Sequence, residues 1–311
     1  MRIKNAFKIL ISNSILIYKS MIYKLVTASI IGLIAYFIIQ RDVEHILYSS
    51  EVNAFWNAII NTLTGFVKGN GLNTDIVPQT FDAVLSMLKA NASTITVSFF
   101  KVGLCVYVLN VVERMGNYAI GVLTDKYMSA LSKYSLVSTL FANIGRAFIY
   151  SIIIVPLAMM FDGLVVVLGI LIAVYGIRVF SIFAVIMALM FIVIALSCKY
   201  TLLLRFMPQL ITDKAPIGKA FRNCFAKREK FFAMVGNYAF VVMISFYLNV
   251  SVAVFTLGAG LIISIPLTSL FPQLVAFVDH YQLSGKRYYV SGEEVVTPRQ
   301  VKKHNELLKY M

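Results

Sequence analysis

The feature that most constrains this chain is a segment, residues 147–204, that is almost wholly apolar. The charged residues within it are Asp162, Arg178 and Lys199. A membrane-crossing helix needs about 20 apolar residues, and inside a bilayer a helix satisfies its own backbone hydrogen bonds. The segment is therefore long enough for two membrane helices.

The composition extends this conclusion to the whole chain. Of its 311 residues, 59% are hydrophobic and 14% are charged, and the mean hydropathy is +0.82, which is more apolar surface than a water-soluble fold of this size can bury. In a soluble protein the net charge of +14 would point to nucleic acid, but here the basic residues flank apolar runs. We therefore expect an all-α polytopic membrane bundle of about six transmembrane helices plus amphipathic interfacial helices, with no nucleic-acid partner.

The apolar runs, taken in order, define a bundle over residues 1–280 and a soluble tail over 281–311. The turn inside 147–204 lies either at 161–163 or at 175–180, and we favour the second because the first leaves two spans of very unequal length. In the tail, alternating residues predict a short β-hairpin, and Thr297-Pro298 is typical of a helix start. The predicted spans are about 22–39, 94–112, 147–174, 179–204, 231–250 and 253–278.

The longest polar interval, 43–91, also has helical periodicity. Apolar residues recur at helical spacing before the break at 68–75, and Pro78 opens a second such pattern. This interval predicts an outer helical hairpin. It is either a lid that packs on the bundle or headgroups, or an ectodomain that binds a ligand or partner.

The segment 211–246 predicts a helix on the membrane surface that leads into a span. At a period of 3.6 residues, one stripe is apolar and the opposite face is basic. Weaker versions of this pattern occur in 1–24 and 113–146, so we expect three such units. The apolar stripe comprises Ile217, Ala220, Phe221, Cys224, Phe225 and Phe231, and the basic face comprises Lys219, Arg222, Lys227 and Lys230.

The basic residues are sorted to one side of the predicted spans. Segments 1–24, 113–146, 199–230 and 286–309 hold 23 of the 28 Lys and Arg residues. Positive charge accumulates on the cytoplasmic side of membrane proteins. We therefore expect an inner-membrane protein with both termini in the cytoplasm.

Two groups of charged residues are candidate sites. Lys101 lies inside a predicted span, where an unpaired ammonium is costly, and Asp162 lies at a similar predicted depth, so we expect a Lys101–Asp162 ion pair that locks the bundle or lines a polar path. The cations near 199–230 predict a site for anionic lipid headgroups, or a topology determinant without a specific ligand. The candidate headgroup-binding residues are Arg205, Lys219, Arg222, Lys227 and Arg228.

No catalytic or metal-binding pattern is present in the sequence. Cys105, Cys198 and Cys224 are far apart in mostly apolar surroundings, and the three His residues lie in separate parts of the chain. We expect no enzyme activity, no cofactor and no metal.

Residues 202–237 carry a family resemblance. A span there ends in an aromatic-Pro-x-Leu-Ile pattern, and an acidic residue, an Ala-aromatic-basic helix start and a basic turn follow. The matching residues are Phe206, Pro208, Leu210, Ile211, Asp213, Ala220, Phe221, Arg222, Lys227 and Lys230, with Asn5-Ala6-Phe7-Lys8 and Val278-Asp279-His280-Tyr281 elsewhere. The chain thus resembles bacterial six-span proteins related to the membrane domain of glycerophosphoryl diester phosphodiesterase and the YciC-like group. The resemblance implies their six-span fold and membrane location, but no catalysis, because their spans accompany the chemistry without performing it.

The leading interpretation is a non-enzymatic inner-membrane protein that acts on or through anionic lipid or a membrane partner. The first alternative is a small-solute or lipid transporter that uses the Lys101–Asp162 region and the last span, which Gly and Pro interrupt. The second alternative is a membrane-embedded enzyme. No oligomeric state follows from the sequence.

Overall fold

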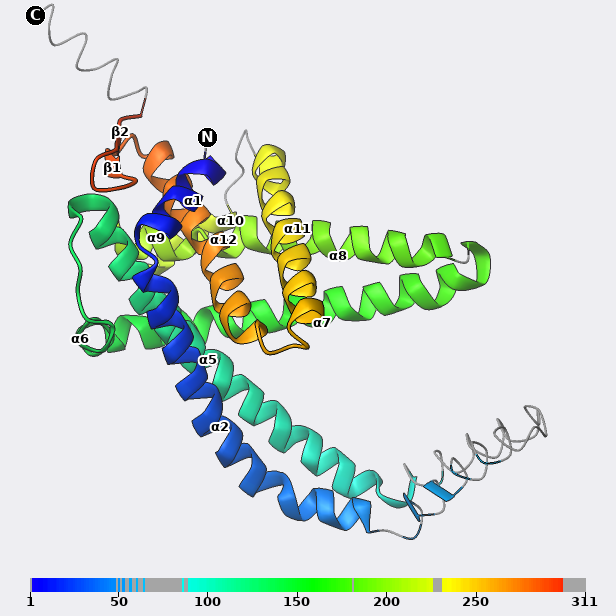
Figure 1. The fold of residues 1–311 in the computed structure, drawn as a ribbon. Helices are drawn as coiled ribbons and strands as arrows, with labels where there is room; N and C mark the ends of the chain where they lie inside the picture. Colours follow the sequence, from blue (N-terminus) through cyan, green and yellow to red (C-terminus); the bar gives the residue numbers. More distant parts are fainter. Residues whose placement is uncertain are drawn as a thin grey trace, which may run out of the picture. The chain divides into compact units, whose positions relative to one another are not determined.

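The computed structural model describes residues 2–48, 91–180, 182–225 and 231–298, and isolated residues between 50 and 90. These parts are almost entirely helical (Figure 1). The predicted outer hairpin and the predicted helix after Thr297-Pro298 lie largely outside the described residues. The elements are α1 (Arg2–Ser12), α2 (Ile15–Leu47), α5 (Ala92–Ala130), α6 (Leu136–Ala142), α7 (Ile144–Phe180), α8 (Ile182–Leu203), α9 (Phe206–Ile211), α10 (Ile217–Phe225), α11 (Phe231–Phe255), α12 (Leu261–Leu283), β1 (Tyr288–Tyr289) and β2 (Val295–Val296).

Within the described residues, six helices are long and apolar enough to cross a membrane, namely α2, α5, α7, α8, α11 and α12. The all-α polytopic fold is therefore confirmed. The helices extend beyond the predicted spans, most clearly α5, which continues to Ala130. A helix need not end where the bilayer ends, because an amphipathic segment propagates the same hydrogen-bond pattern. Residues 113–130 are thus part of α5 and do not form a separate surface helix.

The position of the turn inside 147–204 follows from the helix ends. Helix α7 runs through 161–163 without a break and ends at Phe180, and α8 begins at Ile182. The chain therefore reverses next to the favoured turn at 175–180. Helices α7 and α8 form an antiparallel hairpin, and α11 packs across α8 (Figure 1).

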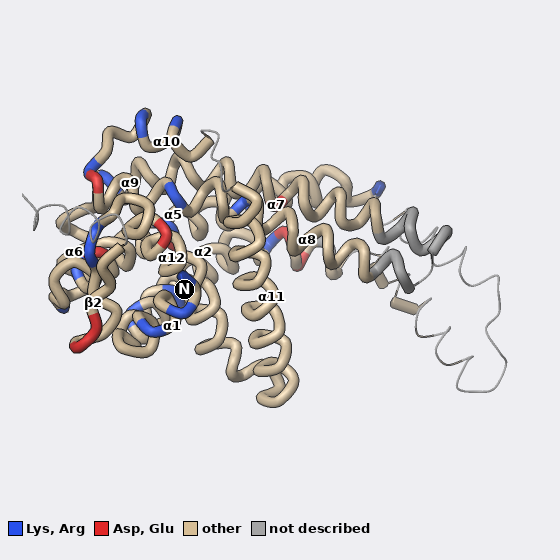
Figure 2. Tube along the Cα trace, turned by 90° about the horizontal axis from the view of Figure 1, so that it is seen from above, with Lys and Arg blue, Asp and Glu red and all other residues tan. Residues whose placement is uncertain are grey.

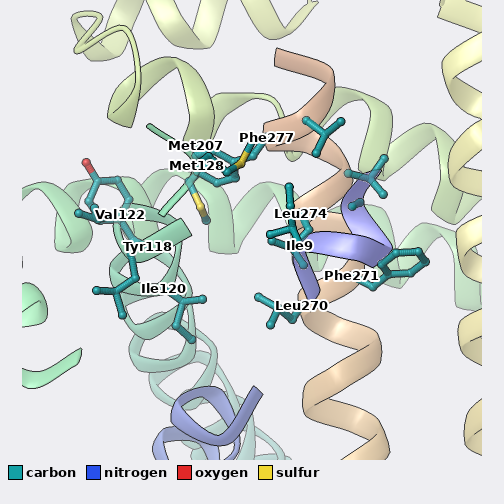
Figure 3. Close-up of a cluster of buried hydrophobic side chains, with 14 of the residues drawn as sticks. Ile9, Tyr118, Ile120, Val122, Met128, Met207, Leu270, Phe271, Leu274 and Phe277 are labelled. Atoms are coloured by element: carbon teal, nitrogen blue, oxygen red, sulfur yellow. The ribbon is translucent and has the colours of Figure 1, made fainter. Parts of the chain in front are cut away.

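The chain divides into two compact units, one comprising Met1–Val26 and Val111–Met311 and the other Thr27–Asn110. The larger unit contains the main buried core, which we call the helical body. It contains α1, residues 118–128 of α5, the start of α7, helices α9 and α10, and residues 270–281 of α12. Figure 3 shows part of this core, in which Ile9 of α1 lies beside Leu274 of α12.

Helix α1 differs from the predicted surface helix over 1–24. The helix ends at Ser12, and its apolar side chains Ala6, Ile9 and Leu10 are buried in the helical body. The described tail also covers α1, since Asn5 Nδ2 donates a hydrogen bond to Tyr288 Oη at 2.7 Å. The predicted β-hairpin is present in this tail as an antiparallel β1–β2 pair. Helix α1 therefore packs between α12 and the tail.

Candidate functional site

The structure gives each residue of the predicted Lys101–Asp162 ion pair a different partner. Lys101 Nζ donates to Asp42 Oδ2 at 2.7 Å within the smaller unit, and Lys199 Nζ lies 2.6 Å from both oxygens of Asp162. Depth along the membrane normal, the basis of the prediction, does not determine which helices are neighbours. One sequence signal could have found the second pair, since 162 and 199 are equally distant from the turn of the α7–α8 hairpin.

The Lys199–Asp162 pair fixes α7 against α8 where the helical body ends. The Lys199 side chain is only 7% exposed, while that of Asp162 is 49% exposed. An ammonium group removed from water requires a paired anion, which Asp162 supplies. The pair is therefore a structural bridge within one hairpin.

Arg205, a candidate headgroup ligand, is instead buried in the helical body. Its Nη2 lies 3.3 Å from Asp279 Oδ2, both side chains are 5% exposed, and Arg2 contacts the other carboxylate oxygen. Arg205 is therefore not accessible to a lipid headgroup, and the prediction is corrected at this position. Through its ion pairs with Arg2 and Arg205, Asp279 connects the start of the chain and the α8–α9 junction to α12. These contacts explain why a charged residue lies near the end of an apolar helix.

The remaining headgroup candidates lie on or after α10. Ala220 and Cys224 are buried and Lys219 and Arg222 are exposed, so the amphipathic pattern is present in this helix. Lys227 and Arg228 lie outside the described residues. Figure 2 shows Lys and Arg gathered around α1, α9 and α10, whereas α11 has none.

The connection between α9 and α10 is anchored by two acidic residues. Asp125 accepts hydrogen bonds from the hydroxyls of Thr212 at 2.6 Å and Tyr281 at 2.8 Å. Asp213 pairs with Lys286 at 2.7 Å, and His280 Nε2 lies 3.0 Å from its other oxygen. Burial acts to raise the pKa of Asp213, but the hydrogen bond with Lys286 and the charge of His280 outweigh burial and hold that pKa below its ordinary value.

The sequence did not predict an apolar groove between α1, α11 and α12. The groove has a volume of about 320 Å³, and Phe7 and Phe271 meet edge to face within it. Lys4, which is exposed, is the one charged residue among the described side chains that line it. The lining residues are Ile3, Lys4, Phe7, Leu10, Ile244, Ser245, Leu248, Leu267, Thr268 and Phe271.

Ser245 contributes an unusual polar atom to this groove. Its Oγ is buried and has no hydrogen-bond partner within the described part of the chain. A buried hydroxyl without a partner is costly, and native proteins contain few of them. The groove therefore offers one hydrogen-bond donor inside an otherwise apolar wall.

Possible metal ligands do not cluster in the described ranges. There, no three His, Cys, Asp or Glu side chains lie close enough together to hold a metal ion. Cys105, Cys198 and Cys224 form no disulfide within the described residues, and Cys224 is buried, as expected for a small hydrophobic residue.

The fold and its apolar spans define the class of protein as a polytopic helical membrane protein. Comparisons with protein-family models, with curated proteins and with solved structures find no match to this chain.

Proposed function

We propose that this chain is a non-enzymatic inner-membrane protein that binds an anionic phospholipid in the groove between α1, α11 and α12. The observation that carries the proposal is the groove itself, which joins apolar walls to a single cation, Lys4. In this proposal both termini face the cytoplasm, because segments 1–24, 113–146, 199–230 and 286–309 hold 23 of the 28 Lys and Arg residues.

The walls of the groove match an acyl chain in chemistry and size. The volume of about 320 Å³ falls in the range of ligand pockets, which are mostly apolar with a few polar groups that fix orientation. Two of its three walls, α11 and α12, are candidate membrane spans, so a bilayer lipid can reach it without crossing water. An acyl chain is the apolar ligand that a membrane supplies in excess.

The polar atoms of the groove match the rest of a phospholipid. A Lys or Arg near an anionic membrane surface contributes about 1 kcal/mol of attraction to acidic lipid. In this proposal Lys4 therefore binds the phosphate of the lipid. The buried Ser245 hydroxyl is a donor without a partner among the described residues, and an ester carbonyl is an acceptor. The exposed Lys219 and Arg222 add a basic surface on α10 that attracts the same lipids.

The test measures bound lipid directly. The protein is purified in mild detergent, exchanged into phosphatidylglycerol or phosphatidylcholine micelles, and analysed by native mass spectrometry. We expect Leu248→Trp to fill the groove and remove most bound lipid, whereas Val250→Trp, on the exposed face of α11, leaves it bound. We expect Lys4→Gln to reduce the preference for phosphatidylglycerol about fivefold, because it removes about 1 kcal/mol of attraction.

A matched control for charge is Arg287→Gln, which removes one exposed cation outside the groove. The proposal fails if Leu248→Trp retains as much lipid as the Val250→Trp protein. The proposed role of Lys4 is wrong if the Lys4→Gln and Arg287→Gln proteins have the same preference for phosphatidylglycerol over phosphatidylcholine.

The transporter alternative has lost its main support. It relied on a Lys101–Asp162 pair, and Lys101 is bound to Asp42 while Asp162 is bound to Lys199. Lipid binding without transport therefore remains the function that we propose.

A further inference from the structure

A second cavity, which we call the basic pocket, lies elsewhere in the helical body. It has a volume of about 220 Å³ and lies between α5, the start of α7, α9 and the segment that leads into α10. It shares no lining residue with the lipid groove. The lining residues are Tyr118, Arg146, Leu210, Lys214, Ala215, Pro216 and Ile217.

Two cations line the basic pocket without a counter-charge. Arg146 and Lys214 are both exposed, and neither forms an ion pair within 4.0 Å with any carboxylate in the described residues. The nearby acidic residue Asp213 is already bound to Lys286 and lies against His280. The pocket therefore carries net positive charge.

Lys214 is held in a strained backbone conformation. Its φ is +51°, in the left-handed region that side chains other than those of Gly and Asn rarely adopt. The hydrogen bond from Ala215 N to Gln209 O and the ion pair of Asp213 hold the two flanking residues in place. Strain of this kind is often found at ligand sites, where the surrounding contacts maintain it.

Tyr118 supplies a third group that points to a ligand. The residue is 1% exposed and lines the pocket, and its hydroxyl forms no hydrogen bond with another described residue. Figure 3 shows the hydroxyl oxygen directed away from the buried apolar cluster. A phenol hydroxyl without a protein partner is available to donate to a bound acceptor. An acceptor atom in the basic pocket would provide a partner.

The backbone adds to the positive potential. Ile217 is the first residue of α10 and lines the pocket, and Arg146 lies in the first turn of α7. The first N–H groups of a helix have no partner inside the helix, and the helix dipole places partial positive charge there. Such ends bind phosphate when other groups complete the site.

We infer that the basic pocket binds the phosphate group of a phosphomonoester. Arg146 presents a planar set of donors that matches two phosphate oxygens, and Lys214 adds a point charge. The Tyr118 hydroxyl donates to a third oxygen. The phosphomonoester is either the headgroup of a phosphatidic-acid lipid or a soluble phosphate ester, since both present the same dianion.

The experiment uses the full chain in phosphatidylcholine nanodiscs and has two arms. One arm measures equilibrium binding of inorganic phosphate and of glycerol 3-phosphate, and the other measures phosphatidic acid retained in mixed nanodiscs. Binding in the first arm identifies a soluble ligand, and retention in the second arm alone identifies the lipid. We expect Arg146→Gln and Lys214→Gln each to weaken ligand binding about tenfold. The reason is that each variant removes a hydrogen bond to a charged group.

Two further variants keep the inference testable. Tyr118→Phe retains the buried ring, so the protein folds, and it weakens binding several-fold through the lost hydroxyl alone. Lys133→Gln removes an exposed cation outside the pocket and leaves binding unchanged. The inference is overturned if neither arm detects binding, or if Lys133→Gln weakens it as much as Arg146→Gln does. Leu248→Trp separates it from the proposed function, because filling the lipid groove does not alter phosphate binding here.

Discussion

The two halves of α12 have similar apolar composition but opposite surroundings. Ile262, Ile263 and Ile265 in the first half are exposed, whereas residues 270–278 are all buried in the helical body. Apolar character alone therefore does not separate a lipid-facing surface from a protein core, because both environments exclude water. Larger polar side chains mark the buried half: Gln273 and Asp279 bind Asn117 and Arg205 there. The buried polar residues of the first half are the smaller Ser264 and Thr268.

The largest expected effect comes from breaking the charged contact at the buried end of α12. Asp279→Ala leaves Arg205 buried and unpaired, and we expect a loss of about 3–5 kcal/mol in the free energy of unfolding. Denaturant unfolding in detergent micelles measures it. The double variant Arg205→Met/Asp279→Leu should recover part of this loss, because it removes the buried charge of Arg205 and leaves only the 23% exposed Arg2 without its partner. A loss below 1 kcal/mol for Asp279→Ala would show that the carboxylate does not stabilise the body.

A smaller loss of stability is expected from truncating one buried side chain, and the same truncation in the exposed half of α12 is its control. Leu274→Ala removes a fully buried side chain and creates a cavity, so we expect a loss of about 2–5 kcal/mol. Ile263→Ala, its control in the exposed half, changes stability by less than about 0.5 kcal/mol, because that side chain contacts no packed core. Thermal unfolding of both variants measures the contrast. Equal losses would mean that the exposed half is also packed against protein.

The sequence was sufficient for features that depend on local periodicity. The six apolar helices, the β1–β2 hairpin and the buried stripe of Ala220 and Cys224 all follow from spacing along one segment. Each depends on hydrophobic runs, alternation or a 3.6-residue period, which the chain displays directly.

The sequence was not sufficient for contacts between distant segments. The partner of Asp162 required knowledge of which helices are neighbours, and the burial of Arg205 depended on an acidic residue in α12. The apolar groove between α1, α11 and α12 and the basic pocket each combine residues from at least three segments. A basic residue between two apolar runs has the same local pattern whether it faces lipid or pairs inside a core, so only tertiary packing separates these cases.

The smallest expected effect concerns an ion pair near the surface, in contrast to the buried pair of Asp279. The pKa of Asp213 is held below 3.8 in the folded protein, so its carboxylate stabilises the fold fully above that value. The stabilisation is lost as the pH falls through the lowered pKa of the folded state. Because Asp213 and Lys286 are 37% and 40% exposed, we expect Asp213→Asn to cost no more than about 1 kcal/mol at pH 7.

The pH dependence of unfolding tests the role of this ion pair. The stability difference between Asp213→Asn and the unmodified protein should be full above the ordinary pKa of an Asp side chain and should shrink as the pH falls through the lowered pKa of the folded state, where the carboxylate takes up a proton. Lys286→Gln should reproduce the effect, because it removes the same contact from the other side. A difference that does not shrink as the pH falls would assign the role of Asp213 to packing, since a protonated Asp213 forms no ion pair with Lys286.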